Sequence, residues 1–126
     1  MMGITGEDAV AVSKGFRSWV LEQLGQVQPV TGKAMFGGLG IYATGLFFAL
    51  ADDDRLYFKV DDGTRARYRD AGMGAFDPFK DGRTMEGYYE VPGEVLEDEE
   101  RLVEWMSEAI GVAARAKAVK PKKARR

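Results

Sequence analysis

Hydrophobic and polar residues alternate along residues 34–60, in three short runs that two turn-like segments separate. A two-residue period is typical of β-strands, whose successive side chains point to opposite faces of a sheet. Gly45 in the first turn can adopt a positive φ, and the aspartates at 52–54 in the second tolerate the left-handed region. The pattern predicts three antiparallel strands joined by two tight turns.

The alternation divides these side chains between two faces of the sheet, provided that no register slip intervenes. One face is predicted to lie against the core, and it contains Leu39, Ile41, Leu46, Phe48, Leu50, Leu56, Phe58 and Val60. The second face contains Tyr42, Phe47, Ala49, Tyr57 and Lys59.

Helical periodicity precedes and follows these strands. A first amphipathic helix is predicted over residues 5–25, with a buried stripe of Val12, Phe16, Trp19, Val20 and Leu24. A short helix is expected over residues 64–71. A long helix is expected from its N-cap Asp98 to residue 117, with a buried stripe of Leu102, Val103, Met106, Ala109, Ile110 and Ala113.

A further pair of strands is predicted over residues 75–80 and 84–91, around the turn signal Asp81-Gly82. The order is then one helix, three strands, one helix, two strands and one helix. Antiparallel strands interspersed with helices in this way are typical of α+β domains. We expect a two-layer α+β domain with an antiparallel five-stranded sheet, whose first and last helices cover one face.

The amino-acid composition excludes several classes of catalytic and metal-binding site. The chain of 126 residues suits one domain and contains neither His nor Cys. Ser-His-Asp and Cys-His catalysis and the usual zinc sites are therefore excluded. We expect no catalytic, cofactor-binding or metal-binding residues: the aspartates at 52–54 are interpreted as a turn, and Gly37, Gly38 and Gly40 as a bulged strand rather than a phosphate-binding loop.

Three features of the sequence bear on where the protein is located in the cell. No apolar run is long enough to span a membrane, and residues 1–7 lack the basic start and apolar stretch of a secretory signal. The absence of Cys is also compatible with a reducing compartment. We expect a cytoplasmic protein.

Charge is distributed unevenly along the chain. Residues 1–114 carry a formal charge of −9, and residues 115–126 carry +7. We expect a folded domain over residues 1–117 and a basic, disordered tail over residues 118–126. The acidic body and the absence of aromatic residues from the tail argue against a dedicated nucleic-acid binder. The tail could still attract phosphate without sequence preference through Lys120, Lys122, Lys123, Arg125 and Arg126.

The second sheet face is the main candidate for binding. If no helix covers it, its aromatic side chains would form a surface for a protein partner or a small ligand. Two arrangements remain open: the loop over residues 73–83 covers the face with Phe76 and Phe79, or the face is open and a homodimer buries it. The residues of this predicted surface are Tyr42, Phe47, Tyr57 and Lys59.

A longer pattern resembles a known family. It consists of Met35-Phe36-Gly37-Gly38-Leu39-Gly40-Ile41-Tyr42, Leu46-Phe47-Phe48-Ala49-Leu50, Leu56-Tyr57-Phe58-Lys59-Val60-Asp61, Pro78-Phe79, Met85, Tyr88-Tyr89-Glu90-Val91-Pro92 and the helix with Trp105. This spacing, over roughly residues 10–117, resembles the N-terminal domain of the TfoX/Sxy family. The resemblance implies a secretion-chaperone-like two-layer fold with the order of elements predicted above.

The resemblance also implies a non-enzymatic role and supplies no catalytic residues. Two-domain members of this bacterial family regulate natural competence and act with the cyclic-AMP receptor protein at promoters. This chain departs from them, because a short basic tail stands where they have a C-terminal helical domain. We therefore expect an interaction module, a transcription co-regulator that acts through a protein partner. The alternatives are a small-ligand-binding domain that uses the aromatic face, and weak nucleic-acid association through the tail.

Overall fold

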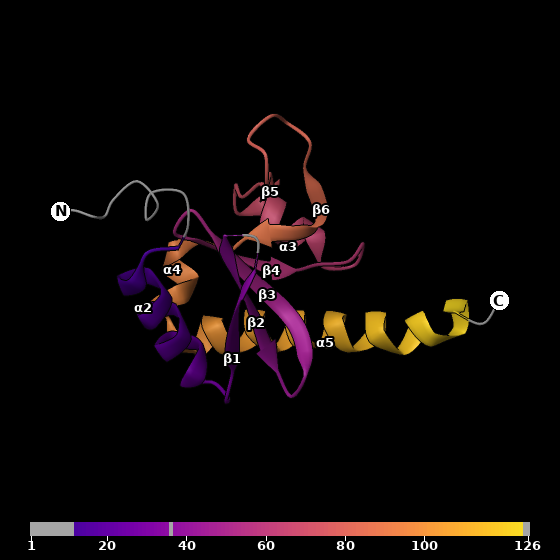
Figure 1. The fold of residues 1–126 in the computed structure, drawn as a ribbon, viewed down its shortest axis with the longest axis horizontal. Coiled ribbons are helices and arrows are strands. Elements are labelled where there is room, and N and C mark those ends of the chain that lie inside the picture. The colour runs from indigo at the N-terminus through magenta and orange to yellow at the C-terminus, as the bar shows by residue number, and fades with distance from the viewer. Residues whose placement is uncertain (1–11, 36, 125–126) are drawn as a thin grey trace.

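The computed structural model describes residues 12–35 and 37–124 and has an α+β architecture (Figure 1). Its strands form one antiparallel sheet of six strands in the order β1-β2-β3-β4-β6-β5. The elements in chain order are α2 (Lys14–Gly25), β1 (Thr31–Met35), β2 (Gly38–Ala43), β3 (Leu46–Asp52), β4 (Arg55–Lys59), α3 (Arg65–Asp70), β5 (Ala75–Phe76), β6 (Met85–Glu90), α4 (Gly93–Leu96) and α5 (Glu99–Ala124).

The predicted five-stranded sheet is wrong by one strand. Strand β1, at the edge of the sheet, begins before the predicted strands, and it pairs with β2 from Thr31 opposite Tyr42 to Met35 opposite Gly38. Gly37 lies between the two strands with a φ of 80°, which glycine adopts without a Cβ clash. A hairpin therefore stands where the alternation predicted a single strand.

One face of the sheet is covered by α2 and α5, as predicted. Helix α5 contacts β3 and β4, and its Met106 is fully buried. Val20 and Leu24 of α2 join the same hydrophobic core as Phe58 of β4, and all three are 0% exposed. Burying side chains of this size removes enough apolar surface from water to be the main source of the domain's stability.

A β-bulge in β3 changes which side chains reach this core. Ile41 pairs with Ala49 and Tyr42 pairs with Phe47, so Phe48 is an extra residue in β3 that has no pairing partner in β2. Phe48 and Ala49 are both 0% exposed and belong to the core. The prediction that Ala49 points away from the core and Leu50 toward it is therefore wrong, because the bulge shifts the alternation by one residue.

Both outer helices differ from their predicted bounds. Helix α2 begins at Lys14, and the Ser13 hydroxyl caps it by accepting a 3.2 Å hydrogen bond from Phe16 N. The predicted start at residues 5–11 lies outside the described residues. Asp98 caps α5 as predicted, because its carboxylate accepts hydrogen bonds from the backbone of Glu100 and Arg101.

Helix α5 runs past the predicted boundary at residue 117 and ends at Ala124. The segment expected to be disordered thus continues the helix through Pro121. Alanine and lysine, which are strong helix formers, surround this proline. Figure 1 shows that the C-terminal half of α5 projects beyond the sheet.

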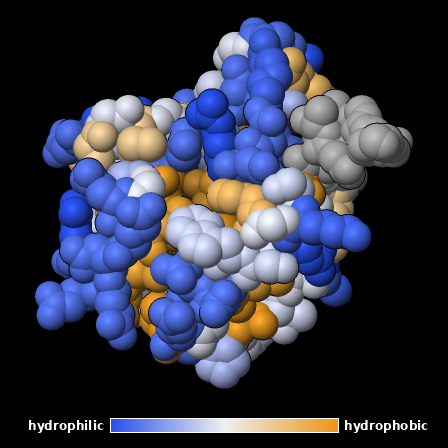
Figure 2. All heavy atoms as spheres, turned by 90° about the vertical axis from the view of Figure 1, so that its left-hand side faces the viewer, coloured by the Kyte–Doolittle hydropathy of each residue, from blue (hydrophilic) through white to orange (hydrophobic). Residues whose placement is uncertain are grey.

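The predicted stripe of the first helix is only partly buried. Val20 and Leu24 are inside, whereas Trp19 is 36% exposed. Viewed from the side on which α2 lies in Figure 1, the molecule brings hydrophobic residues to the surface in the middle, with hydrophilic residues around them (Figure 2). The helix therefore does not seal the core completely on this side.

Candidate binding cavity on the open sheet face

The second face of the sheet, which we call the open face, carries the predicted binding residues. The register places Tyr42 beside Phe47, Tyr57 beside Leu50 and Lys59 beside Tyr88. Paired residues of an antiparallel sheet point to the same side. Tyr57 and Lys59 are two residues apart in β4, and the rings of Phe47 and Tyr88 are 5.9 Å apart, so all six side chains share one face. The helices α2 and α5 pack on the opposite face.

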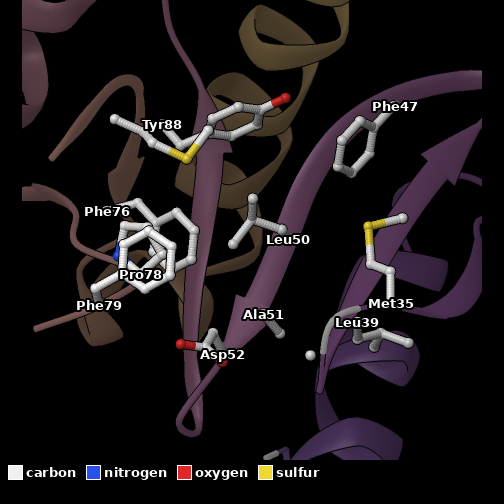
Figure 3. A pocket seen from close by; sticks show the side chains of 12 residues that line it. Met35, Leu39, Phe47, Leu50, Ala51, Asp52, Phe76, Pro78, Phe79 and Tyr88 are labelled. Atoms are coloured by element: carbon white, nitrogen blue, oxygen red, sulfur yellow. The ribbon is translucent and has the colours of Figure 1, made fainter. Parts of the chain in front are cut away.

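A cavity of about 490 Å³ lies on the open face (Figure 3). Leu50 stands between Phe47 and Met35 on one side and the side chains of Phe76, Pro78 and Phe79 on the other. The residues that line the cavity are Met35, Gly38, Leu39, Phe47, Leu50, Ala51, Asp52, Phe76, Pro78, Phe79, Met85 and Tyr88. Among the described residues, the lining is therefore apolar, with Asp52 as the one charged member.

The four predicted residues play different parts at this cavity. Phe47 lines it, and Tyr42 stacks on Phe47 with 5.1 Å between ring centroids. Tyr57 is 7% exposed and packs against Phe76 at 4.8 Å, so it supports the opposite wall. Lys59 places Nζ 4.8 Å from the ring centroid of Tyr88. Three of the four thus hold lining residues in place.

The loop between β5 and β6 forms a wall of the cavity and does not cover it. The carboxylate of Asp77 accepts hydrogen bonds from the backbone N–H groups of Asp81 and Gly82. These bonds within the loop stabilise its conformation. Phe79 is 67% exposed and Met85 is 44% exposed, so the rim of the cavity is apolar and accessible. The sequence predicted Phe76 and Phe79 near this face but left open whether they would close it.

Two glycines and a methionine shape the other wall. A Cβ added to Gly40 would lie 2.5 Å from Met35 Cε and 3.2 Å from Phe47 Cε1, because both side chains cross the strand at that point. A Cβ on Gly38 would lie 2.6 Å from the Ala51 carbonyl oxygen. The crowded glycines of this strand therefore permit close approach of neighbours, beside the bulge in the next strand.

The charged end of the cavity is formed by the turn between β3 and β4. Asp53 and Asp54 adopt φ values of 53° and 54°, as the sequence predicted for this turn. Lys80 Nζ lies 3.7 Å from the Asp52 carboxylate and 3.8 Å from that of Asp53. Asp54 instead accepts a 2.8 Å hydrogen bond from Ser13 N. Two carboxylates thus share one ammonium group at distances longer than a direct hydrogen bond.

The phenol groups of Tyr57 and Tyr88 stay protonated near neutral pH. Burial and the nearby Glu90 carboxylate raise the pKa of Tyr57 to about 12. Burial, with a smaller contribution from Tyr42, also raises the pKa of Tyr88 above its ordinary value. The aromatic part of this face therefore offers neutral rings and hydroxyl groups for binding.

The other predicted features lie away from the cavity. Lys120, Lys122 and Lys123 belong to the last part of α5, and Arg125 and Arg126 lie outside the described residues. Within residues 12–35 and 37–124, no group of three or more acidic side chains could hold a metal ion. Over the same ranges, no helix is both long and apolar enough to cross a membrane.

Comparison with known families matches this chain to the model described as the TfoX N-terminal domain, over residues 22–113. The chain belongs to the TfoX N-terminal domain family. A search of curated proteins returned no match. The matched range contains the whole sheet and all the residues that line the cavity. The family points to a competence-regulator-like module.

Sequence reasoning missed several residues of this TfoX N-terminal domain's cavity. Leu50 was assigned to the wrong face because the bulge was not visible in the alternation. Met35 and Asp52 reach the cavity through the β1–β2 hairpin and the strand register, which only the fold defines. Tyr88 could have been found, since period-two alternation in β6 places it opposite its buried neighbour Tyr89.

Proposed function

We propose that the protein is a non-enzymatic interaction module, a transcription co-regulator that acts through a protein partner bound at the open face. The exposed apolar rim of the cavity is the observation that carries this proposal. Phe79 and Met85 are both more than one-third exposed and lie beside a hollow of about 490 Å³. Exposed apolar surface of this kind favours contact with another molecule.

Family membership and composition support the same role. The match to the TfoX N-terminal domain is compatible with competence-regulator-like work. The chain lacks His and Cys, which removes the most common general bases and nucleophiles. A partner surface needs neither.

A photo-crosslinking experiment tests the proposal. A photoreactive amino acid replaces Phe79 at the cavity rim, and the same residue replaces Val103 on α5 as the control, because Val103 is a large apolar residue that is 43% exposed. We expect a specific product with a transcription component from position 79 and none from position 103. Identical products from both positions, or no product from position 79, would refute a partner surface on the open face.

A second candidate function, the binding of a small ligand, is supported by the properties of the cavity. Ligand pockets in proteins typically enclose roughly 300–1,000 Å³ and are mainly apolar, and this cavity of about 490 Å³ has both properties. A thermal-shift screen with metabolites and nucleotides tests this candidate, because a ligand that binds only the folded state raises the unfolding temperature. No shift with any compound would count against it.

A further inference from the structure

We propose that the cavity binds an amphipathic amine, with its apolar body against Leu50 and the surrounding rings and its ammonium group at Asp52. This proposal rests on the second function above, that the cavity is a small-ligand site, and adds the chemical class of the ligand. The class follows from three properties of the cavity: its apolar walls, the position of its one charge and the loose pairing of that charge.

The walls select an apolar body. Phe47 on one side of Leu50, and Phe76 and Phe79 on the other, supply aromatic surface (Figure 3). Met35 and Met85 add thioether side chains, which adapt to ligands of different shape. A purely polar ligand would bury no apolar surface of its own against these walls. A ligand with affinity for the cavity therefore needs an aliphatic or aromatic portion.

The charge at one end selects a cation. Asp52 lies at the end of β3, below Leu50 in Figure 3, and its side chain is 19% exposed. Among the described residues, no hydrogen-bond donor reaches its carboxylate within bonding distance, and the nearest cation is Lys80 Nζ at 3.7 Å. A ligand ammonium group could supply the missing donor, and charge-assisted hydrogen bonds of this type are the stronger ones.

Lys80 does not neutralise this end of the cavity. Its Nζ is divided between Asp52 and Asp53, and its side chain is 59% exposed. Asp52 and Asp53 therefore share a single lysine, and Asp54 bonds to the backbone of Ser13 instead, which leaves the turn negative. The other lysines that reach the open face, Lys33 and Lys59, lie against the rings of Tyr42 and Tyr88 and are not part of the lining. A carboxylate ligand would consequently meet repulsion where an ammonium ligand meets attraction.

Three probes with the same alkyl chain test the class: n-octylamine, n-octanol and n-octanoate, each titrated into the full chain. Methionine methyl groups labelled with carbon-13 report the site by NMR, because Met35 and Met85 line the cavity whereas Met106 is buried in the core. We expect the amine to shift the signals of Met35 and Met85, to leave Met106 unchanged, and to bind about tenfold more tightly than the carboxylate.

Matched variants locate the charge that matters. Asp52→Asn is expected to weaken amine binding about tenfold and to leave octanol binding unchanged. Asp53→Asn removes the same charge from the same turn but does not line the cavity, so a change below about threefold is expected. Lys80→Gln removes the competing cation and is expected to strengthen amine binding.

The outcomes separate this inference from the functions on which it builds. Equal affinity for all three probes, or equal effects of Asp52→Asn and Asp53→Asn, would overturn the amine class while the cavity remained a ligand site. Absence of any shift at Met35 and Met85 would overturn the amine class, and only a thermal-shift screen in which no compound stabilises the protein would overturn the small-ligand function as well. The crosslinking result at position 79 is independent of either outcome.

Discussion

The two faces of the sheet are formed by the same strands, but one is covered by helices and the other contains a cavity. Phe47 and Phe48 are adjacent in sequence and identical in chemistry, yet Phe48 is fully buried under the helices and Phe47 lines an open cavity. The helix-covered face is filled by side chains from α2, α5 and the strands. Of the described segments, the β5–β6 loop alone lies beside the open face, which keeps a cavity of about 490 Å³.

This difference separates stability from binding within one sheet. Protein cores are packed as densely as organic crystals. The large apolar side chains around the cavity therefore make fewer van der Waals contacts than those of the covered face. The residues of the open face can therefore change with less effect on folding than those of the covered face. The predictions below test that contrast, from the largest expected effect to the smallest.

The first prediction compares the adjacent phenylalanines. Phe48→Ala leaves a cavity in the core and is expected to lower the free energy of unfolding by about 3–5 kcal/mol. Phe47→Ala enlarges a space that is already open, and about 1–2 kcal/mol is expected from the lost contact with Tyr42 and lost burial. Urea denaturation measures both. Equal losses would contradict the proposed difference between the faces.

The second prediction enlarges a side chain on each face. Ala49→Leu adds volume at a fully buried position, and overpacking is expected to cost about 1–3 kcal/mol. Leu50→Phe adds volume into the cavity and is expected to change the unfolding free energy by less than about 0.5 kcal/mol. The same variant should weaken octylamine binding, since the added ring takes up space in the cavity. A greater loss of stability for Leu50→Phe than for Ala49→Leu would show that the cavity does not accommodate a larger side chain.

The third prediction concerns two tyrosine hydroxyls. The Tyr68 hydroxyl is buried without a hydrogen-bond partner among the described residues, whereas the Tyr89 hydroxyl donates to Glu86 at 2.7 Å. Tyr68→Phe is expected to stabilise the protein by about 1 kcal/mol, because an unsatisfied buried group is removed. Tyr89→Phe is expected to destabilise it by a similar amount. Thermal unfolding of both variants checks the signs, and a loss of stability in Tyr68→Phe would contradict this reading.

The fourth prediction concerns a carboxylate on the covered side. Burial raises the pKa of Glu108 above its ordinary value of 4.5, although Arg67 opposes this shift. The folded state therefore holds the proton more firmly than the unfolded state, and this contribution to stability is lost as pH rises through the raised pKa. Glu108→Gln is expected to remove this fall in the free energy of unfolding with rising pH, which amounts to less than about 1 kcal/mol.

Unfolding free energies measured from below pH 4.5 to neutral pH test this. Glu104→Gln is the control, because Glu104 is on the same helix and also pairs with Arg67 but its side chain is 62% exposed. The control is expected to keep the decline of the unsubstituted protein. Equal pH profiles for the two variants would show that burial of Glu108 is not responsible.

The smallest effect on stability is expected from the end of α5. Deleting residues 118–126 removes part of a helix that projects beyond the sheet, so the unfolding free energy should change by less than about 0.5 kcal/mol. Retention on a DNA column at low salt should fall, because the deleted segment carries five of the basic residues. Unchanged, salt-independent retention would dismiss nucleic-acid contact through this segment.

Much of the fold could be predicted from the sequence because its signals are local. Alternation located β3, β4 and β6, and helical periodicity located α2 and α5. Strand β1 was missed because its sequence, Thr-Gly-Lys-Ala-Met, has one β-branched residue and a glycine, and it depends on β2 for its pairing. Isolated short segments of that kind carry little β signal of their own.

The candidate site was less predictable because it depends on contacts between distant segments. The sequence identified the aromatic face, and Phe47 does line the cavity. It could not place Asp52, because that residue's position follows from the strand register, nor Leu50, because Leu-Phe-Phe-Ala-Leu-Ala fits the core on either phase of the alternation. The distance between the β5–β6 loop and the sheet is a property of tertiary packing alone.

The extra residue at Phe48 has a consequence for how relatives of this chain are compared. A residue-by-residue scan of tolerated substitutions should change phase within β3: position 47 permissive, 48 and 49 both restrictive, and 50 permissive again. A homologue that is one residue shorter at this point would keep regular alternation to the end of the strand. Aligning such a homologue without a gap at Phe48 would exchange inner and outer positions for the rest of the strand.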